Sequence, residues 1–183
     1  MKKILILAIT LAASVISTQT FAQKTKMVGG AAMYPTKDIV DNAVNSKDHT
    51  TLVAAVKAAG LVETLKSAGP FTVFAPTNAA FDKLPEGTVG ELIKPENKAT
   101  LTKILTYHVL AGKFSAAQIA KAIKDGNGKA EFSTVSGGKL WASMDGKNLI
   151  LTDEKGGKSM VTISDVFQKN GVIHVVDTVV MPG

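Results

Sequence analysis

Cysteine and arginine are both absent from the 183-residue sequence. Without cysteine, the chain has no disulfide bridge, no thiolate metal ligand and no thiol to carry a lipid anchor. Without arginine, it lacks the planar, bidentate fork that favours the recognition of phosphate and of guanine. All 21 basic residues are therefore lysines. The two absences therefore exclude disulfide-stabilised folds, thiolate metal sites and lipid-anchored lipoproteins, and they make phosphate or guanine recognition less favourable.

Aromatic residues are also scarce, at 5% of the chain, and the lysines are dispersed along it. Proteins that bind nucleic acids usually combine aromatic stacking platforms with a concentrated basic surface. We therefore predict no nucleic-acid partner. The formal net charge of +6 still permits a weak attraction to acidic polysaccharides or to cell-envelope surfaces.

Signatures of catalysis are missing as well. The sequence contains no Gly-x-Ser-x-Gly elbow, no phosphate-binding glycine loop and no His-Glu-x-x-His motif. The three histidines, His49, His108 and His174, are not at the close spacing of zinc ligands. We therefore predict no catalytic site, no metal and no cofactor. A metal-dependent hydrolase built on the three histidines is the enzymatic alternative.

His174 and Asp177 resemble a catalytic base with its orienting acid, but they lie three positions apart on an expected strand. Side chains of a strand alternate between its two faces, so an odd separation places these two on opposite faces. We therefore expect each of them to satisfy a different buried backbone or hydroxyl group.

The first 22 residues have the pattern of a secretory signal peptide. A positive start with Lys2 and Lys3 precedes a short apolar run at residues 4–16, and small residues follow up to Ala22. We expect cleavage after Ala22 and export to the periplasm or the extracellular space. No later segment is apolar over a membrane-spanning length, so we expect no transmembrane segment after cleavage.

The remaining 161 residues, 183 less 22, suit one domain with a sizeable core. Residues 23–33 contain the pair Gly29-Gly30 and predict a flexible segment, and residues 34–183 predict the domain. Helical spacing dominates the first part of the domain, whereas strand-like alternation dominates from about residue 130 onward. Helices first and strands later indicate an α+β fold.

The stretch from Gly69 to Pro85 predicts a strand, a corner and a helix. Residues 71–75 alternate as a buried strand requires, and Pro76 ends that strand because proline donates no hydrogen bond to a sheet. Thr77 can then cap a helix, since its hydroxyl accepts a hydrogen bond from a free backbone amide.

A longer helix is predicted from Pro95 to Gly112. On this helix, His108 falls on the apolar stripe and Tyr107 falls at the border of the opposite side. The apolar run at residues 172–180 predicts a central strand covered on both faces. Asn170-Gly171 predicts a tight turn before that strand, with positive φ available to both residues.

Three ordered motifs of the sequence resemble those of the fasciclin domain family. They are the segment Phe-Ala-Pro-Thr-Asn-Ala-Ala-Phe at residues 74–81, the tyrosine-histidine segment at 104–112, and the segment at 170–182 that begins Asn-Gly. The matches span nearly all of the chain from about Met33 to Pro182. The resemblance implies a single fasciclin-like domain, in which a wedge of β-strands is packed with several helices.

The resemblance also implies candidate binding residues. In animal fasciclin domains the tyrosine-histidine segment is implicated in integrin-type adhesion, and Tyr107 and His108 match it. A second adhesion motif of those domains is an aspartate followed by isoleucine. The corresponding pair in this chain is Asp165-Val166, and the residues around it do not match the motif. Integrin binding is therefore not carried over to this chain. A buried histidine that holds the helix to the sheet is the alternative for His108.

The other residues of the three motifs are predicted to have structural roles. They are Phe74, Pro76, Thr77, Phe81, Asn170, Gly171, His174 and Asp177. The function implied is that of a non-enzymatic adhesion or interaction domain at the cell envelope or in an extracellular matrix such as a biofilm. Its partner would be a cell-surface or matrix protein or a polysaccharide. The alternative is a periplasmic protein that binds a small molecule or polysaccharide in a pocket beside the long helix.

Overall fold

The computed structural model describes residues 24–183, so the predicted signal peptide lies outside the described residues. The helices are α1 Ile39–Ala43, η1 Lys47–His49, α2 Thr50–Ala59, α3 Val62–Lys66, α4 Asn78–Asp82, α5 Thr88–Leu92, η2 Pro95–Asn97, α6 Lys98–Tyr107 and α7 Ala116–Asp125, with η for a 3₁₀ turn. The strands are β1 Lys26–Val28, β2 Ala31–Met33, β3 Phe71–Pro76, β4 Val109–Ala111, β5 Lys129–Ser133, β6 Lys139–Asp145, β7 Asn148–Thr152, β8 Lys158–Gln168 and β9 Gly171–Val176. None of the helices described is long and apolar enough to cross a membrane.

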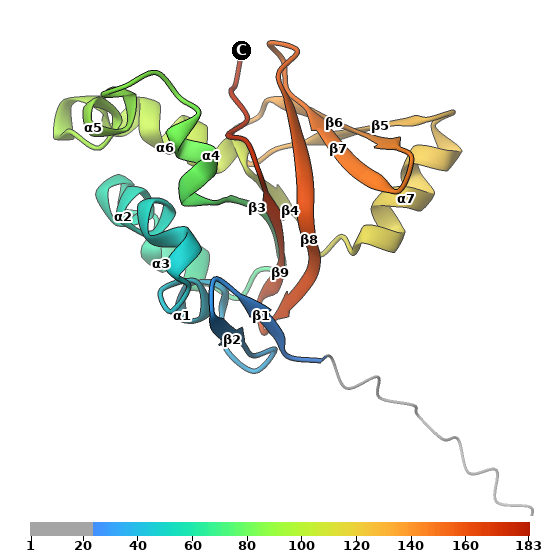
Figure 1. Cartoon of the computed structure of the whole chain (residues 1–183), viewed down its shortest axis with the longest axis horizontal. Helices are drawn as coiled ribbons and strands as arrows, with labels where there is room; N and C mark the ends of the chain where they lie inside the picture. The colour runs from blue at the N-terminus through green and yellow to red at the C-terminus, as the bar shows by residue number, and fades with distance from the viewer. Residues whose placement is uncertain (1–23) are drawn as a thin grey trace, which may run out of the picture.

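Seven strands form one sheet in the order β4-β3-β9-β8-β7-β6-β5 (Figure 1). Neighbouring strands are antiparallel except β3 and β9, which run parallel with Phe71 opposite Gly171. The two ends of the sheet approach each other, because Leu110 forms a bridge with Thr134. The sheet is therefore a nearly closed barrel, and the predicted α+β class is confirmed.

Helices cover the sheet on two sides (Figure 1). Helices α1 to α6 lie together beside β3 and β9, whereas α7 packs against β5 and β6. One core lies between α1–α6 and the sheet, and a second core fills the inside of the curved sheet beneath α7. Strand β9 is buried at every position, because it lies in the middle of the sheet between the two cores. The central strand predicted from the apolar run is thus confirmed, but it ends at Val176 and not at residue 180.

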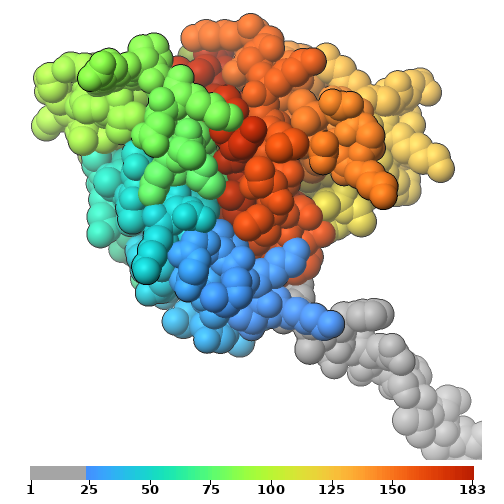
Figure 2. Space-filling model, in the orientation of Figure 1, coloured from blue at the N-terminus to red at the C-terminus, as the bar shows by residue number. Residues whose placement is uncertain are grey.

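Residues 26–33 are not the flexible segment that the sequence predicted for residues 23–33. They form a hairpin, β1 paired with β2, and Figure 2 shows it packed against the helices and strands beside it. Val28 and Met33 each expose only 1% of their surface. The two glycines, Gly29-Gly30, adopt positive φ and form the hairpin turn. Their presence therefore marks a turn and not a mobile linker.

The helix predicted from Pro95 to Gly112 is shorter in the structure. A 3₁₀ turn precedes α6, the helix ends at Tyr107, and strand β4 follows directly. The apolar pattern continues past the helix because Val109 and Leu110 are buried in the strand. Hydrophobic spacing alone therefore did not mark the end of the helix.

Gly171 is required for a different reason from the one predicted. Neither Asn170 nor Gly171 has positive φ, so a strained turn is not the constraint. A β-carbon at position 171 would overlap the carbonyl oxygen of Phe71 on the paired strand and press on Ile39. The close approach of β3 to β9 excludes a side chain at this position.

We predict that Gly171→Val lowers the free energy of unfolding by more than about 1 kcal/mol, because the side chain would force β3 away from β9. Urea denaturation of the purified domain measures the change. Gly90→Ala is the matched control, since Gly90 lies in α5 with open space around it, and it should lose no stability. An unchanged free energy for Gly171→Val would contradict the steric role.

Candidate functional site

Tyr107, the last residue of α6, is completely buried. Its hydroxyl donates a hydrogen bond to the Lys139 carbonyl at 2.5 Å and accepts one from the Glu154 amide at 3.2 Å. Burial raises the pKa of Tyr107 to about 12. The prediction that Tyr107 lies at the border of a polar side is wrong. Helix α6 passes between the two cores: Ile104 and Leu105 are buried in the first core, whereas Tyr107 is buried in the second.

His108 caps the same helix and is 3% exposed. Its Nδ1 donates to the Ile104 carbonyl at 2.9 Å, and its Nε2 accepts from the Val180 amide at 3.1 Å. These two bonds require a neutral ring with its proton on Nδ1. Burial lowers the pKa of His108 to about 4. His108 therefore fixes the end of α6 to the chain that follows β9.

Asp165 and Val166 lie where the pairing of β8 with β9 is irregular. Val166 is fully buried, and Asp165 has a positive φ of 54°. The Asp165 carboxylate accepts a hydrogen bond from the amide of Ala116, the first residue of α7, at 2.7 Å. A negative charge at this end of the helix also suits its dipole. Asp165 thus connects α7 to the sheet.

The four candidate binding residues do not form one exposed site. Tyr107, His108 and Val166 are buried, and the hydrogen bonds of Tyr107 and Asp165 go to different segments of the described chain. A partner protein would have to open the domain to reach Tyr107, His108 or Val166, whereas Asp165 is half-buried.

His174 lies on the central strand β9 and is fully buried. Its Nε2 donates to the Phe114 carbonyl at 2.8 Å, and its Nδ1 accepts from the Asp165 amide at 3.3 Å. The ring also stacks on Phe74, with 5.7 Å between the ring centroids. Burial lowers the pKa of His174. The side chain therefore holds the loop before α7 against the sheet.

Asp177 makes a separate set of contacts. Its carboxylate accepts hydrogen bonds from the Met160 amide at 2.8 Å and from the Thr178 hydroxyl at 3.0 Å. His174 and Asp177 consequently do not pair with each other, as predicted, but the reason differs: Asp177 lies beyond the end of β9 at Val176, so strand alternation does not apply to it.

The segment at residues 74–81 forms the corner between β3 and α4. Phe74 is buried in the second core and Phe81 in the first. Pro76 ends β3, and the Thr77 hydroxyl accepts a hydrogen bond from the Ala80 amide at 3.2 Å. The corner thus joins both cores.

Asn170 connects three segments through its side-chain amide. Its Oδ1 accepts a hydrogen bond from the Ile39 amide at 3.0 Å, at the start of α1. Its Nδ2 donates to the carbonyls of Leu65 at 2.7 Å and Ser67 at 2.9 Å, at the end of α3. The Asn170 side chain therefore holds α1 and α3 at the start of β9.

Asp153 is a buried residue that the sequence reasoning missed. Its carboxylate accepts hydrogen bonds from the amides of Lys155, Gly157 and Met181 at 2.7 to 3.0 Å. It thereby closes the turn between β7 and β8 and fixes the chain after β9. An aspartate three positions before a glycine pair, as in Asp153 and Gly156-Gly157, is a sign of such a turn, and this signal was available in the sequence.

Histidines do not converge on a metal site. His49 lies beside the Ser46 hydroxyl, with 2.9 Å between Nδ1 and Oγ, while His108 and His174 bond to the separate groups described above. Within residues 24–183, no three histidine, aspartate or glutamate side chains gather into a group that could hold a metal ion.

The outward side chains of β5 to β8 are mostly polar around the single tryptophan, with Ile150 and Met160 as partly exposed apolar neighbours. We call this surface the tryptophan face, defined by Lys129, Glu131, Lys139, Trp141, Thr152 and Lys158. Cross-strand pairing places Glu131, Trp141, Thr152 and Lys158 in one row, and the residues that alternate with them point into the core. The sequence reasoning identified these strands but did not single out Trp141.

Charged groups surround the indole ring on this face. Trp141 Nε1 donates to the Glu131 carboxylate at 3.1 Å, and Lys129 Nζ lies 4.8 Å from the ring centroid. Lys139 forms an ion pair with Glu131 at 3.0 Å and lowers the pKa of that carboxyl. Three lysines and one glutamate give the face an excess of positive charge.

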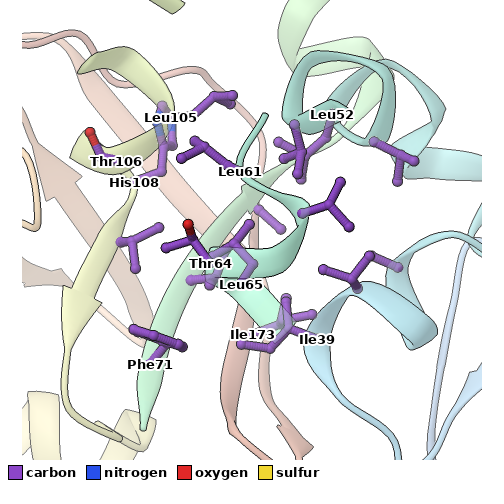
Figure 3. Close-up of a pocket in the computed structure, with 18 of the residues that line it drawn as sticks. Ile39, Leu52, Leu61, Thr64, Leu65, Phe71, Leu105, Thr106, His108 and Ile173 are labelled. Carbon is purple, nitrogen blue, oxygen red and sulfur yellow. The ribbon is translucent and has the colours of Figure 1, made fainter. Parts of the chain in front are cut away.

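A second feature, an apolar cavity, lies beside α3 (Figure 3). It encloses about 70 Å³, and its walls come from α1, α2, α3, β3 and the end of α6. Side chains of Leu52, Leu61, Leu65 and Ile173 surround it. No polar surface is exposed to this cavity.

Comparison with known proteins identifies the class to which this α+β domain belongs. The profile of the Fasciclin domain matches residues 47–182. The chain therefore belongs to the fasciclin domain family, and the family predicted from the three motifs is confirmed.

Relatives occur among bacterial proteins. Protein sll1483 of Synechocystis sp. is 47% identical over 161 residues, which cover 87% of this chain and 82% of that protein. The cell surface glycolipoprotein MPB83 of Mycobacterium bovis is 35% identical over 160 residues, which cover 85% of this chain and 64% of that protein.

A solved structure shows the same fold. It is a FAS1 domain pair from the insect cell adhesion molecule Fasciclin I, with a TM-score of 0.69 at 16% sequence identity. The match covers 79% of this chain and 50% of that chain. The nearly closed sheet with its helical layer is thus the FAS1 fold.

We predict that acid destabilises the domain through His108. The pKa of this side chain is about 4 in the folded protein, against 6.5 for an ordinary histidine. As the pH falls below 6.5, His108 becomes protonated in the unfolded chain but stays neutral in the folded chain. The free energy of unfolding should therefore fall by about 1.4 kcal/mol per pH unit down to about pH 4, or by about 3 kcal/mol in total.

The test compares the wild type with His108→Gln by urea denaturation at pH 7 and pH 4.5. Glutamine retains a donor and an acceptor but does not titrate. The wild type should lose about 2–3 kcal/mol more than the variant between the two pH values. His49 and His174, whose pKa values burial also lowers, contribute equally to both proteins. Equal losses would contradict a buried, neutral His108.

Proposed function

We propose that this protein is an exported, non-enzymatic interaction domain that binds acidic polysaccharide at the cell surface or in the surrounding matrix. The predicted signal peptide supports export. One relative is named a cell surface glycolipoprotein, and the related solved structure comes from a cell adhesion molecule. Both names support a place outside the cytoplasm.

The observation that carries this proposal is the tryptophan face. Sugar rings present apolar C–H groups that pack on an indole, while the edges of the ring present hydroxyls for hydrogen bonds. Glu131 and Thr152 lie on either side of Trp141 in the same row and can bond to such hydroxyls. Lys129 and Lys158 then provide positive charge for the carboxylates or sulfates of the polymer.

The other two candidate regions are less suited to a sugar. Tyr107 and His108 are buried and offer no polar atom to a ligand. The cavity beside α3 exposes no polar surface, so hydroxyl groups placed there would lose their hydrogen bonds to water without replacement. A polysaccharide is therefore better matched to the outer surface of the sheet.

We predict that Trp141→Ala weakens binding to an acidic polysaccharide about tenfold, because the stacking surface is lost. The measurement is calorimetric titration with polygalacturonate, with dextran as a neutral polymer. Tyr34→Ala is the matched control, because Tyr34 is an exposed aromatic residue outside the tryptophan face, and Lys37 Nζ lies 5.3 Å from its ring centroid, much as Lys129 lies over Trp141. It should bind as the wild type does. Equal effects of the two substitutions would exclude the tryptophan face.

Salt separates the two components of the interaction. Attraction by the lysines alone should disappear at high ionic strength, whereas stacking on Trp141 should persist. Binding of the domain to its producing cells, before and after enzymatic removal of surface polysaccharide, then identifies the kind of partner. Binding that survives this removal would indicate a surface protein as the partner and would contradict the proposal.

A further inference from the structure

The apolar cavity beside α3 has no part in the polysaccharide binding proposed above. Protein interiors are closely packed and leave few voids larger than a water molecule. The cavity of about 70 Å³ is larger than that. At roughly 10–15 Å³ for each water-sized group, it has room for about five to seven methylene groups. A space of this size with carbon walls is suited to a hydrocarbon chain.

Contacts around α3 hold the cavity in a preformed shape. Asn170 bonds to the carbonyls of Leu65 and Ser67 at one end of the helix. The Lys66 ammonium forms an ion pair with Asp41 of α1 at 2.9 Å. Figure 3 shows Leu61 and Leu65 among the side chains that line the space. A ligand would therefore enter an existing pocket without first folding its walls.

Exposed residues show that the cavity reaches the surface. Val135 lines it and is 47% exposed. Thr64 of α3 and Lys57 of α2 also line it and are exposed. An apolar side chain at the rim allows a hydrocarbon to pass inward without crossing a polar barrier.

Lys57 adds a charge to this rim. None of the ion pairs formed among the described residues includes Lys57. Lys98 reaches the same end of α2, where its Nζ lies 3.3 Å from the position that a β-carbon on Gly60 would take. Lys98 likewise belongs to none of those pairs. Positive charge beside an apolar cavity is complementary to a molecule with a hydrocarbon tail and an anionic head.

We propose that this cavity binds a free, medium-chain carboxylic acid, with its tail beneath α3 and its carboxylate beside Lys57. The volume suits a single chain of about eight carbons and is too small for a lipid with two long chains. The carbon walls exclude a sugar. A neutral hydrocarbon would form no ionic interaction with Lys57.

A chain-length series tests the fit of the tail. Straight-chain carboxylates from butanoate to dodecanoate are titrated into the mature domain and followed by NMR of its methyl groups. Affinity should rise about fourfold for each added methylene and level off near octanoate, where the cavity is full. The shifts should concentrate on Leu52, Leu61 and Ile173.

Three results would overturn the proposal. They are affinity that keeps rising with chain length, shifts centred away from the cavity, and binding only above the micelle concentration. Binding to phosphatidylglycerol vesicles without binding to free octanoate would likewise replace it with a membrane surface.

A matched pair of lysine variants tests whether the carboxylate of the ligand lies beside Lys57. Lys57 and Lys124 each lie in the last turn of a ten-residue helix, but only Lys57 lines the cavity. Lys57→Gln should weaken octanoate binding several-fold and leave binding of 1-octanol unchanged, whereas Lys124→Gln should change neither. Equal effects of the two variants would contradict the placement of the carboxylate.

Two further variants separate this site from the tryptophan face. Ala43 lines the cavity from α1, so Ala43→Leu should abolish octanoate binding and leave polysaccharide binding intact. Trp141→Ala should do the reverse. If Ala43→Leu fails to fold, the methyl shifts of the wild type decide the question alone.

Discussion

The parallel pairing of β3 with β9 is the contact on which the rest of the domain depends. It joins Phe71 to Gly171, 100 positions apart in the chain, and it brings the helical half of the sequence to the strand-rich half. Ile173 and Val175 of β9 belong to the first core and Val176 to the second. Both cores are therefore completed only when this pairing has formed.

Buried polar side chains are concentrated around these two strands. Asn170 lies where the chain enters β9, His174 lies within it, and His108 holds the chain that leaves it. Each of these side chains bonds to backbone groups that would otherwise be buried without partners, a cost that a folded protein avoids. Asn170, His174 and His108 thus connect segments that lie far apart in the sequence.

Local sequence patterns predicted the structure correctly where a whole helix, strand or corner lies in a single environment, such as one core. The corner at Pro76 and Thr77 and the central position of β9 could be predicted because proline, capping and apolar runs act over a few residues. Tyr107 could not be placed in the same way, because α6 passes between two cores and the helical pattern contains no information on the second one. Gly171 was identified, but its reason was missed, since the obstructing carbonyl belongs to Phe71.

The candidate sites likewise depend on contacts between segments that local sequence patterns do not reveal. One of them, the tryptophan face, results from the registers of four strands, and those registers cannot be read from any one strand. The cavity depends on how α1, α2 and α3 lie over the sheet, and Asn170 holds α1 and α3 there. Residues shared with the family thus specify the scaffold, whereas Trp141 and Lys57 lie outside the three motifs. Both sites proposed here therefore depend on residues that the family motifs leave out.

The bridge between Leu110 and Thr134, which nearly closes the sheet, also affects how the molecules behave together. A free strand edge is a template on which another chain can add its own strand, and this is a common route to fibrils. Here the two ends of the large sheet approach each other. Many copies of the domain could therefore be held side by side on one polymer and still remain separate, folded units.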